Sequence, residues 1–227
     1  MSHGNIARLK ELVDRQPALA RASWDWGFGD WESALGAASH VGNREIAEYL
    51  LSKGARPSIF SAAMLGQLDV VKAFVAAQPG AHRTWGPHGI TLLSHAQAGG
   101  DRARPVLEFL TALGDANQKP TLAPLTDEEM KKLIGSYAWG PGADEKFDIA
   151  IGKGFLTLTR PGKTQLNLLH LGSYEFYPIG SFATRFRFAE SGGVWTLTLH
   201  DPDVVLTARR TGVTAPSPSS SRPRAAR

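Results

Sequence analysis

A repeated apolar pattern follows four glycines in the first half of the chain and limits what this half can fold into. The four are Gly4, Gly42, Gly66 and Gly100. Apolar residues stand four, five, eight and nine positions after the second and third of them. The first matches in three of these four positions, and after the fourth the pattern returns one residue late. Such spacing places apolar side chains on one stripe of an α-helix. The first half is therefore predicted to be a series of helices in a common register.

Short motifs around these glycines carry a family resemblance. Ser33–Ala38 and Thr91–Ala96 each begin nine residues before one of the glycines, with a residue that can cap a helix. Both segments resemble the Thr-Pro-Leu-His-x-Ala opening of an ankyrin repeat, and Gly54–Pro57 and Gly114–Asn117 resemble the family's Gly-Ala-Asp-x-Asn exit. The resemblance covers residues 4–118 and implies an α-helical solenoid of about three and a half repeats. The alternative is a generic bundle of helical hairpins.

The register of these repeats is irregular. The glycines are spaced by 38, 24 and 34 residues, whereas the ankyrin period is about 33. The pattern also begins at Gly4, in the middle of a repeat and without a preceding inner helix. We therefore expect that the natural sequence extends further upstream, which makes the missing signal peptide uninformative about location. A cytoplasmic location is the expectation that remains.

The second half of the chain changes to a β pattern. Thr126 and Glu129 form a capping-box signature for a short helix that ends at Ile134. After this helix, seven short β-prone runs alternate with turn residues and predict an antiparallel, barrel-like meander. The runs are Phe147–Ile151, Phe155–Arg160, Gln165–His170, Tyr174–Pro178, Thr184–Ala189, Val194–His200 and Val204–Arg210.

The predicted organisation is thus α+β with two domains. Residues 1–119 form the ankyrin repeats, 120–125 a linker, 126–212 the β domain and 213–227 a disordered tail rich in Pro, Ser and Arg. The β domain also resembles the lipocalin-like accessory domain that follows β-lactamase-related hydrolases in bacteria, on Leu133–Tyr137 and Tyr174–Pro178. No hydrolase motif accompanies it, because the chain contains neither Ser-x-x-Lys nor Gly-x-Ser-x-Gly.

Composition removes several classes of function. The chain contains no cysteine, which excludes disulfides, thiolate nucleophiles and Cys-based zinc sites. The net charge of +4 is concentrated in the last fifteen residues, so neither domain is predicted to present a basic face for nucleic acid. The seven histidines match no metal-ligand spacing, and no cofactor motif occurs. We therefore predict no metal, no cofactor, no nucleic-acid partner and no membrane span.

The candidate site consists of two aromatic loops, Trp24–Glu32 and Trp85–Thr91, which precede the second and fourth repeats. They contain four of the six tryptophans, and such large side chains are costly to leave in water unless they pack or bind. The alternative is that these tryptophans fill the seam against the β domain. By the ankyrin resemblance, the loops and the inner helices form a concave recognition face. The predicted ligand-binding residues are Trp24, Asp25, Trp26, Trp31, Glu32, His40, Met64, Trp85 and His88.

Two functions follow as hypotheses. The favoured one is a recognition module that binds a protein segment or small ligand on its concave face next to the β domain. The alternative is an enzyme with an acid–base pocket at the interdomain seam, built from Asp25, Glu32, His40 and His88 with His95 as a further candidate. This alternative requires a carboxylate within hydrogen-bond reach of a histidine. The sequence identifies neither the ligand nor the oligomeric state, and no catalytic residue is assigned.

Overall fold

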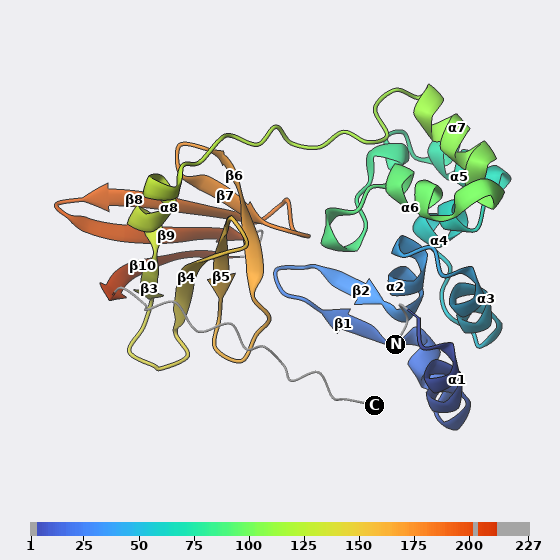
Figure 1. The fold of residues 1–227 in the computed structure, drawn as a ribbon, viewed down its shortest axis with the longest axis horizontal. Helices are drawn as coiled ribbons and strands as arrows, with labels where there is room; N and C mark the ends of the chain where they lie inside the picture. Colours follow the sequence, from blue (N-terminus) through green and yellow to red (C-terminus); the bar gives the residue numbers. More distant parts are fainter. Residues whose placement is uncertain (1–3, 202–203, 213–227) are drawn as a thin grey trace. The chain divides into compact units, whose positions relative to one another are not determined.

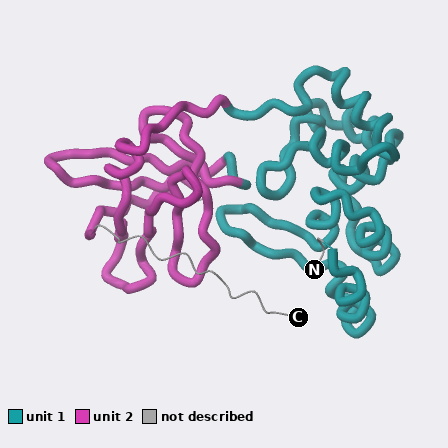
Figure 2. Tube along the Cα trace, in the orientation of Figure 1, with its two compact units in different colours: residues 1–120, 180–182 teal, residues 121–179, 183–227 magenta. Residues whose placement is uncertain are grey.

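The computed structural model describes residues 4–201 and 204–212, and the chain divides into two compact units (Figure 2). The first unit comprises residues 1–120 with 180–182, and the second comprises 121–179 with 183–227. The predicted disordered tail at 213–227 lies outside the described residues. Each unit has its own secondary structure, so the two are described in turn.

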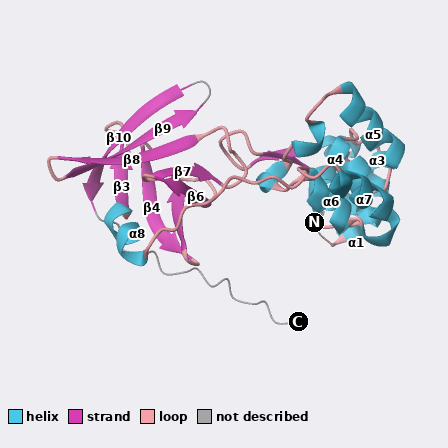
Figure 3. Cartoon of the chain, turned by 90° about the horizontal axis from the view of Figure 1, so that it is seen from above, coloured by secondary structure: helices cyan, strands magenta, loops and turns pink. Residues whose placement is uncertain are grey.

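Short helices dominate the first unit (Figures 1 and 3). Polar side chains cap several of their first turns, as Ser33 does by accepting a 2.9 Å hydrogen bond from the Gly36 amide. The α-helices are α1 (Ile6–Arg15), α2 (Ala34–His40), α3 (Arg44–Ser52), α4 (Ile59–Met64), α5 (Leu68–Ala77), α6 (Leu92–Ala98) and α7 (Arg104–Ala112). Four 3-10 turns accompany them: η1 (Pro17–Arg21), η2 (Ala81–Arg83), η3 (Pro87–Gly89) and η4 (Gly100–Ala103).

The expected ankyrin solenoid is wrong. The helices of the described chain are short, between six and ten residues, and scattered, and they give no evidence of a stack of equivalent repeats. Their buried side chains form two core clusters, one around α1 to α3 and one around α4 to α7, instead of one continuous row. The physical reason is visible in the unequal glycine spacing, because connections of different length cannot place each helix in an equivalent position.

A two-stranded hairpin interrupts the helices between η1 and α2. It consists of β1 (Ser23–Asp25) and β2 (Trp31–Ser33) and extends from the helices of the first unit (Figure 1). Its turn contains Gly27 and Gly29, which both have positive φ, and the Trp26 amide donates to the Asp30 carbonyl at 2.9 Å. Glycine permits this left-handed backbone without a steric penalty. The first of the two aromatic loops in the sequence is thus a β-hairpin.

The second unit is a closed antiparallel β-barrel, so the α+β class and the barrel expectation are confirmed. The strand order around it is β10-β3-β4-β5-β6-β7-β8-β9, in which every pair of neighbours is antiparallel. The strands are β3 (Gly135–Ala138), β4 (Lys146–Gly152), β5 (Phe155–Thr159), β6 (Leu166–Gly172), β7 (Glu175–Pro178), β8 (Arg185–Ser191), β9 (Val194–Asp201) and β10 (Val204–Gly212). Seven of them overlap the seven β-prone runs, and β3 is the strand that the sequence pattern missed.

Aromatic side chains fill the barrel interior. Phe186 is completely buried, and its ring centroid lies 5.6 Å from that of Phe147. The short helix α8 (Asp127–Leu133) precedes β3 and buries Met130 and Leu133. Its first turn has the capping box that the sequence predicts. Alternating burial along β8 and β9 follows from the two-residue period of a strand.

Within the described residues, no helix combines the length and apolar character that crossing a membrane requires.

Candidate functional site

The β1–β2 hairpin presents different side chains on its two faces. Trp24 pairs with Glu32, and Asp25 pairs with Trp31. Residues directly opposite each other in an antiparallel ladder share a face, so Trp24 and Glu32 lie on one face and Trp31 on the other. Trp24 is 63% exposed and Trp31 is 61% exposed, whereas Glu32 is buried. The hairpin therefore exposes the side chains of Trp24 and Trp31 and buries the carboxylate of Glu32.

The Glu32 carboxylate lies between two histidines. Its Oε1 is 3.0 Å from Nδ1 of His40, and its Oε2 is 3.4 Å from Nε2 of His88. Oε2 also accepts a 3.2 Å hydrogen bond from the indole nitrogen of Trp26. Burial alone would raise the pKa of Glu32, but the contacts with both histidines outweigh it and hold the pKa far below its usual range. Glu32 is thus an ionised carboxylate in a nearly closed site.

His88 links this carboxylate to a second one. Its backbone amide donates to Oδ1 of Asp30 at 3.0 Å, and its ring Nδ1 lies 3.0 Å from Oδ2 of the same residue. The contacts with the two carboxylates raise the pKa of His88 to about 9, with Asp30 contributing more than Glu32. The ring is therefore an imidazolium at neutral pH. His88 also has a left-handed backbone, with φ of 60°, in the turn η3. This conformation is uncommon outside glycine, and the double contact with Asp30 compensates for it.

His95 lies behind these groups on α6 and has a different character. It is completely buried, and neither ring nitrogen has a hydrogen-bond partner among the described residues. The ring centroid of His95 is 4.9 Å from that of Phe60 and 6.5 Å from that of His40. Burial, and next the charge of His40, lower the pKa of His95 to about 4, so the ring is neutral at pH 7. We call Asp30, Glu32, His40, His88 and His95 the histidine–carboxylate cluster.

A pocket opens beside this cluster. Its cavity volume is about 250 Å³, and we call it the aromatic pocket. Every described residue that lines it belongs to the first unit, and three of these residues are aromatic. The lining consists of Gly29, Asp30, Trp31, Phe60, Trp85, Gly86, Pro87 and Gly180. Trp85 is fixed there by a 3.3 Å hydrogen bond from its indole nitrogen to the Gln118 carbonyl. Asp30 therefore belongs both to the lining of the aromatic pocket and to the histidine–carboxylate cluster, and the exposed Trp31 lines the same pocket.

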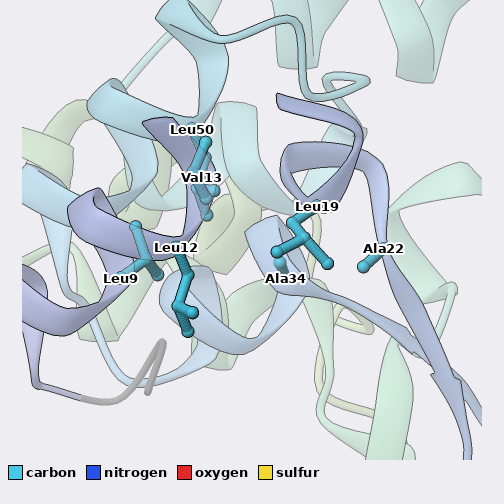
Figure 4. A pocket seen from close by; sticks show the side chains of 7 residues that line it. All are labelled: Leu9, Leu12, Val13, Leu19, Ala22, Ala34 and Leu50. Atoms are coloured by element: carbon cyan, nitrogen blue, oxygen red, sulfur yellow. The ribbon is translucent and has the colours of Figure 1, made fainter. Parts of the chain in front are cut away.

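A second cavity, of about 170 Å³, lies near α1 (Figure 4). The described residues that line it all have apolar side chains: Leu9, Leu12, Val13, Leu19, Ala22, Ala34 and Leu50. Figure 4 shows these side chains around a common space between α1, η1, α2 and α3. Three of them, Leu9, Val13 and Leu50, belong to the core of this part of the unit. Without a polar group to orient a ligand, the cavity is a packing gap, and the aromatic pocket is the better candidate site.

The structure separates the predicted site residues into three groups. Trp26, Glu32, His40 and His88 belong to or contact the cluster, and Trp31 and Trp85 line the aromatic pocket. Trp24 remains exposed on the hairpin, outside both.

Two predicted residues lie elsewhere. The Asp25 carboxylate accepts a hydrogen bond from the Gly27 amide at 2.8 Å and so stabilises the hairpin turn, instead of approaching a histidine. Met64 is completely buried in the apolar core, where it cannot contact a partner of the folded protein. Its expected place on a ligand-facing inner helix depended on the ankyrin register, which is not the register of this fold.

Two residues of the site were not predicted. Asp30 carried a recoverable signal, because residues two apart on a strand share a face and Asp30 precedes Glu32 by two. Phe60 carried none, since it reaches the pocket from a helix that is distant in sequence from both tryptophans.

The chain was compared with protein-family models, with curated proteins and with solved structures, and no comparison gave a match. The resemblance of the second unit to the lipocalin-like accessory domain therefore stays a prediction. Among residues 4–201 and 204–212, no group of three or more His, Cys, Asp or Glu side chains is arranged to hold a metal ion.

Proposed function

We propose that the first unit is a recognition module that binds a small ligand, or a side chain of a protein partner, in the aromatic pocket. One observation carries the proposal: Trp31 and Trp85, from segments far apart in sequence, line the same cavity although Trp31 is 61% exposed. An exposed tryptophan at a concave site is the typical centre of a binding surface. A cavity of about 250 Å³ suits a small group.

The histidine–carboxylate cluster has a supporting role in this proposal. Both oxygens of Asp30 contact His88, and both oxygens of Glu32 contact a histidine. Carboxylates that are engaged in this way fix the hairpin and the η3 turn relative to each other. Binding is favoured when the groups that contact a ligand are held in place before it arrives. The cluster thus preorganises the wall on which Trp31 and Trp85 lie.

A screen by ligand-observed NMR with a set of cationic, neutral and anionic fragments tests the proposal. We expect several fragments to bind the wild-type chain and to lose most of their affinity in the W31A and W85A variants. The melting temperature of W31A is expected to stay close to that of the wild-type chain although fragment affinity falls, because the exposed Trp31 side chain contributes little to packing. If no fragment depends on either tryptophan, or if affinity and stability fall together, the proposal is wrong.

A second candidate function, acid–base catalysis, is favoured by one distance. Nδ1 of His40 lies 3.0 Å from Glu32, which is the contact that a general base and its orienting carboxylate need. The test is a panel of chromogenic esters, phosphates and glycosides with the wild-type chain and the H40Q variant. Turnover that H40Q abolishes would support catalysis, and an inactive wild-type chain would leave binding as the function.

A further inference from the structure

The chemistry of the aromatic pocket selects one class of ligand. Among the described residues that line it, Asp30 is the only charged one, and Trp31, Phe60 and Trp85 provide aromatic rings. We infer that the pocket binds a methylated ammonium cation, such as a trimethylammonium group. The inference rests on the proposed function and names the ligand that the same pocket accepts.

The charges beside the pocket favour a cation. Beside the pocket, the Glu32 carboxylate and the His88 imidazolium have opposite charges that offset each other, which leaves the Asp30 carboxylate as the charged group of the described pocket wall. His95, which lies behind them, is neutral. No lysine, arginine or histidine is among the described lining residues. An anion in the pocket would therefore meet the Asp30 carboxylate, which repels it, with no lining cation to offset that repulsion.

The hydrogen bonds of Asp30 decide which cation fits. Oδ1 accepts from the His88 amide at 3.0 Å, and Oδ2 lies 3.0 Å from His88 Nδ1. A lysine ammonium brings three N–H donors and an arginine guanidinium brings five, and each donor needs an acceptor when it is buried. A quaternary ammonium brings no donor and is attracted by ring faces and by a nearby charge, with little directional demand. Each oxygen of Asp30 already has one contact with His88, so fewer of its lone pairs remain for buried N–H donors, and the methylated cation suits this pocket better.

Calorimetric titration of the full chain with choline tests the inference. The control ligand is the uncharged isostere of choline, in which a tert-butyl group replaces trimethylammonium, because it has the same shape without the charge. We expect choline to bind about tenfold more tightly than the isostere, which corresponds to the usual strength of a cation–π contact. Equal affinities, or a preference for the isostere, would overturn the inference.

Two exposed tryptophans on one hairpin provide matched variants. W31A removes a ring of the pocket, whereas W24A removes a similarly exposed ring that does not line it. We expect W31A to weaken choline binding at least about fivefold and W24A to leave it unchanged. Loss of binding in both variants, or in neither, contradicts the assigned site. In D30N, choline should lose more affinity than the isostere does, with a thermal melt to confirm that the variant is folded.

The outcomes also separate this inference from the proposed function. If neutral or anionic fragments bind in a manner that depends on Trp31 and choline does not, the cation class is wrong and the recognition module stands. If no ligand of any charge depends on Trp31 or Trp85, both are wrong.

Discussion

The barrel and the hairpin-bearing unit hold their parts together by different physical means. In the barrel, each strand pairs with both of its neighbours, and its interior contains aromatic and aliphatic side chains such as Phe147 and Phe186. In the first unit, the β1–β2 hairpin pairs with no third strand among the described residues, and ionised groups anchor it instead. Hydrophobic burial depends little on pH, whereas an ion network depends on it strongly.

This difference is consistent with the proposed binding site in the first unit. A buried ion network is weak evidence for stability, because desolvation offsets much of the attraction between the charges. Its benefit is a defined geometry, which a binding site needs and a barrel wall does not. The hairpin is therefore held by a network of charged groups, whereas the barrel is held by strand pairing and hydrophobic burial.

The largest expected effect belongs to the barrel core. F186A removes a completely buried ring that contacts Phe147 and should cost about 4 kcal/mol of unfolding free energy. Urea unfolding, followed by the indole NMR signal of Trp195 on β9, measures this loss. F155A is the control because Phe155 is 44% exposed, and it should cost less than half as much. If the wild-type unfolding free energy reported by the Trp195 signal varied strongly between pH 5 and 9, the barrel would also depend on ionised groups.

The next effect belongs to the cluster. E32Q keeps the size of the side chain but leaves the His88 imidazolium with one carboxylate fewer, and it should cost about 3 kcal/mol. The indole signal of Trp26, which donates to Glu32, reports the unfolding of this region. The matched control is E48Q on α3, where an exposed carboxylate pairs with Arg44, and its effect should stay below about 1 kcal/mol. Equal costs for the two variants would remove the distinction between the cluster and a surface ion pair.

The pH dependence of stability should show two limbs, both from the cluster. His88 has a raised pKa of about 9, so the folded state binds its proton more tightly and stability falls as pH rises from about 6.5 through 9. His95 has a lowered pKa of about 4, so the unfolded state binds its proton more tightly and stability falls as pH decreases from about 6.5 through 4. Each limb should be on the order of 2 kcal/mol.

Single variants separate the two limbs. H88Q should flatten the alkaline limb of the Trp26 signal, and H95L should flatten the acidic limb above about pH 4.5. Below that pH, protonation of Glu32, whose pKa is lowered in the folded state, reduces stability in both variants. The Trp195 signal of the barrel should change little in either variant. A limb that persists in its variant would assign the titration to another group.

The smallest expected effect is that of W31A on folding. Because Trp31 is 61% exposed, its truncation should change the unfolding free energy by less than about 0.5 kcal/mol, as measured by urea unfolding. A loss above about 2 kcal/mol would mean that this ring is part of the packing of the unit. The Trp31 ring would then be part of the core and would not be available to contact a ligand.

The barrel was the easier half to predict from sequence. Strict alternation, as in Trp195, Leu197 and Leu199, depends only on neighbours along the strand, and such local patterns survive folding. The strand β3 escaped notice because it is four residues long and begins at Gly135, a residue that is rare in strands. The first half showed helical periodicity correctly, but periodicity alone does not specify how the helices assemble.

The site was only partly predictable for a related reason. Glu32 lies two residues before helix α2 and His40 is the last residue of that helix, so the two are close in sequence and their proximity could be expected from local structure. The contact of Asp30 with His88 and the placement of Phe60 depend on how distant segments pack, which no local pattern encodes. Asp25 and Glu32 looked equivalent in sequence, yet the strand geometry assigns one to the turn and the other to the cluster.

The most direct test of recognition by the aromatic pocket uses the six indole N–H resonances of the ¹⁵N-labelled chain. Choline, or the strongest fragment from the screen, is added stepwise, and each resonance is followed to saturation. The account predicts that the signals of Trp31 and Trp85 move together with one dissociation constant, while those of Trp24 and Trp195 stay in place. Saturable shifts confined to Trp24 or Trp195, with Trp31 and Trp85 unmoved, would contradict it.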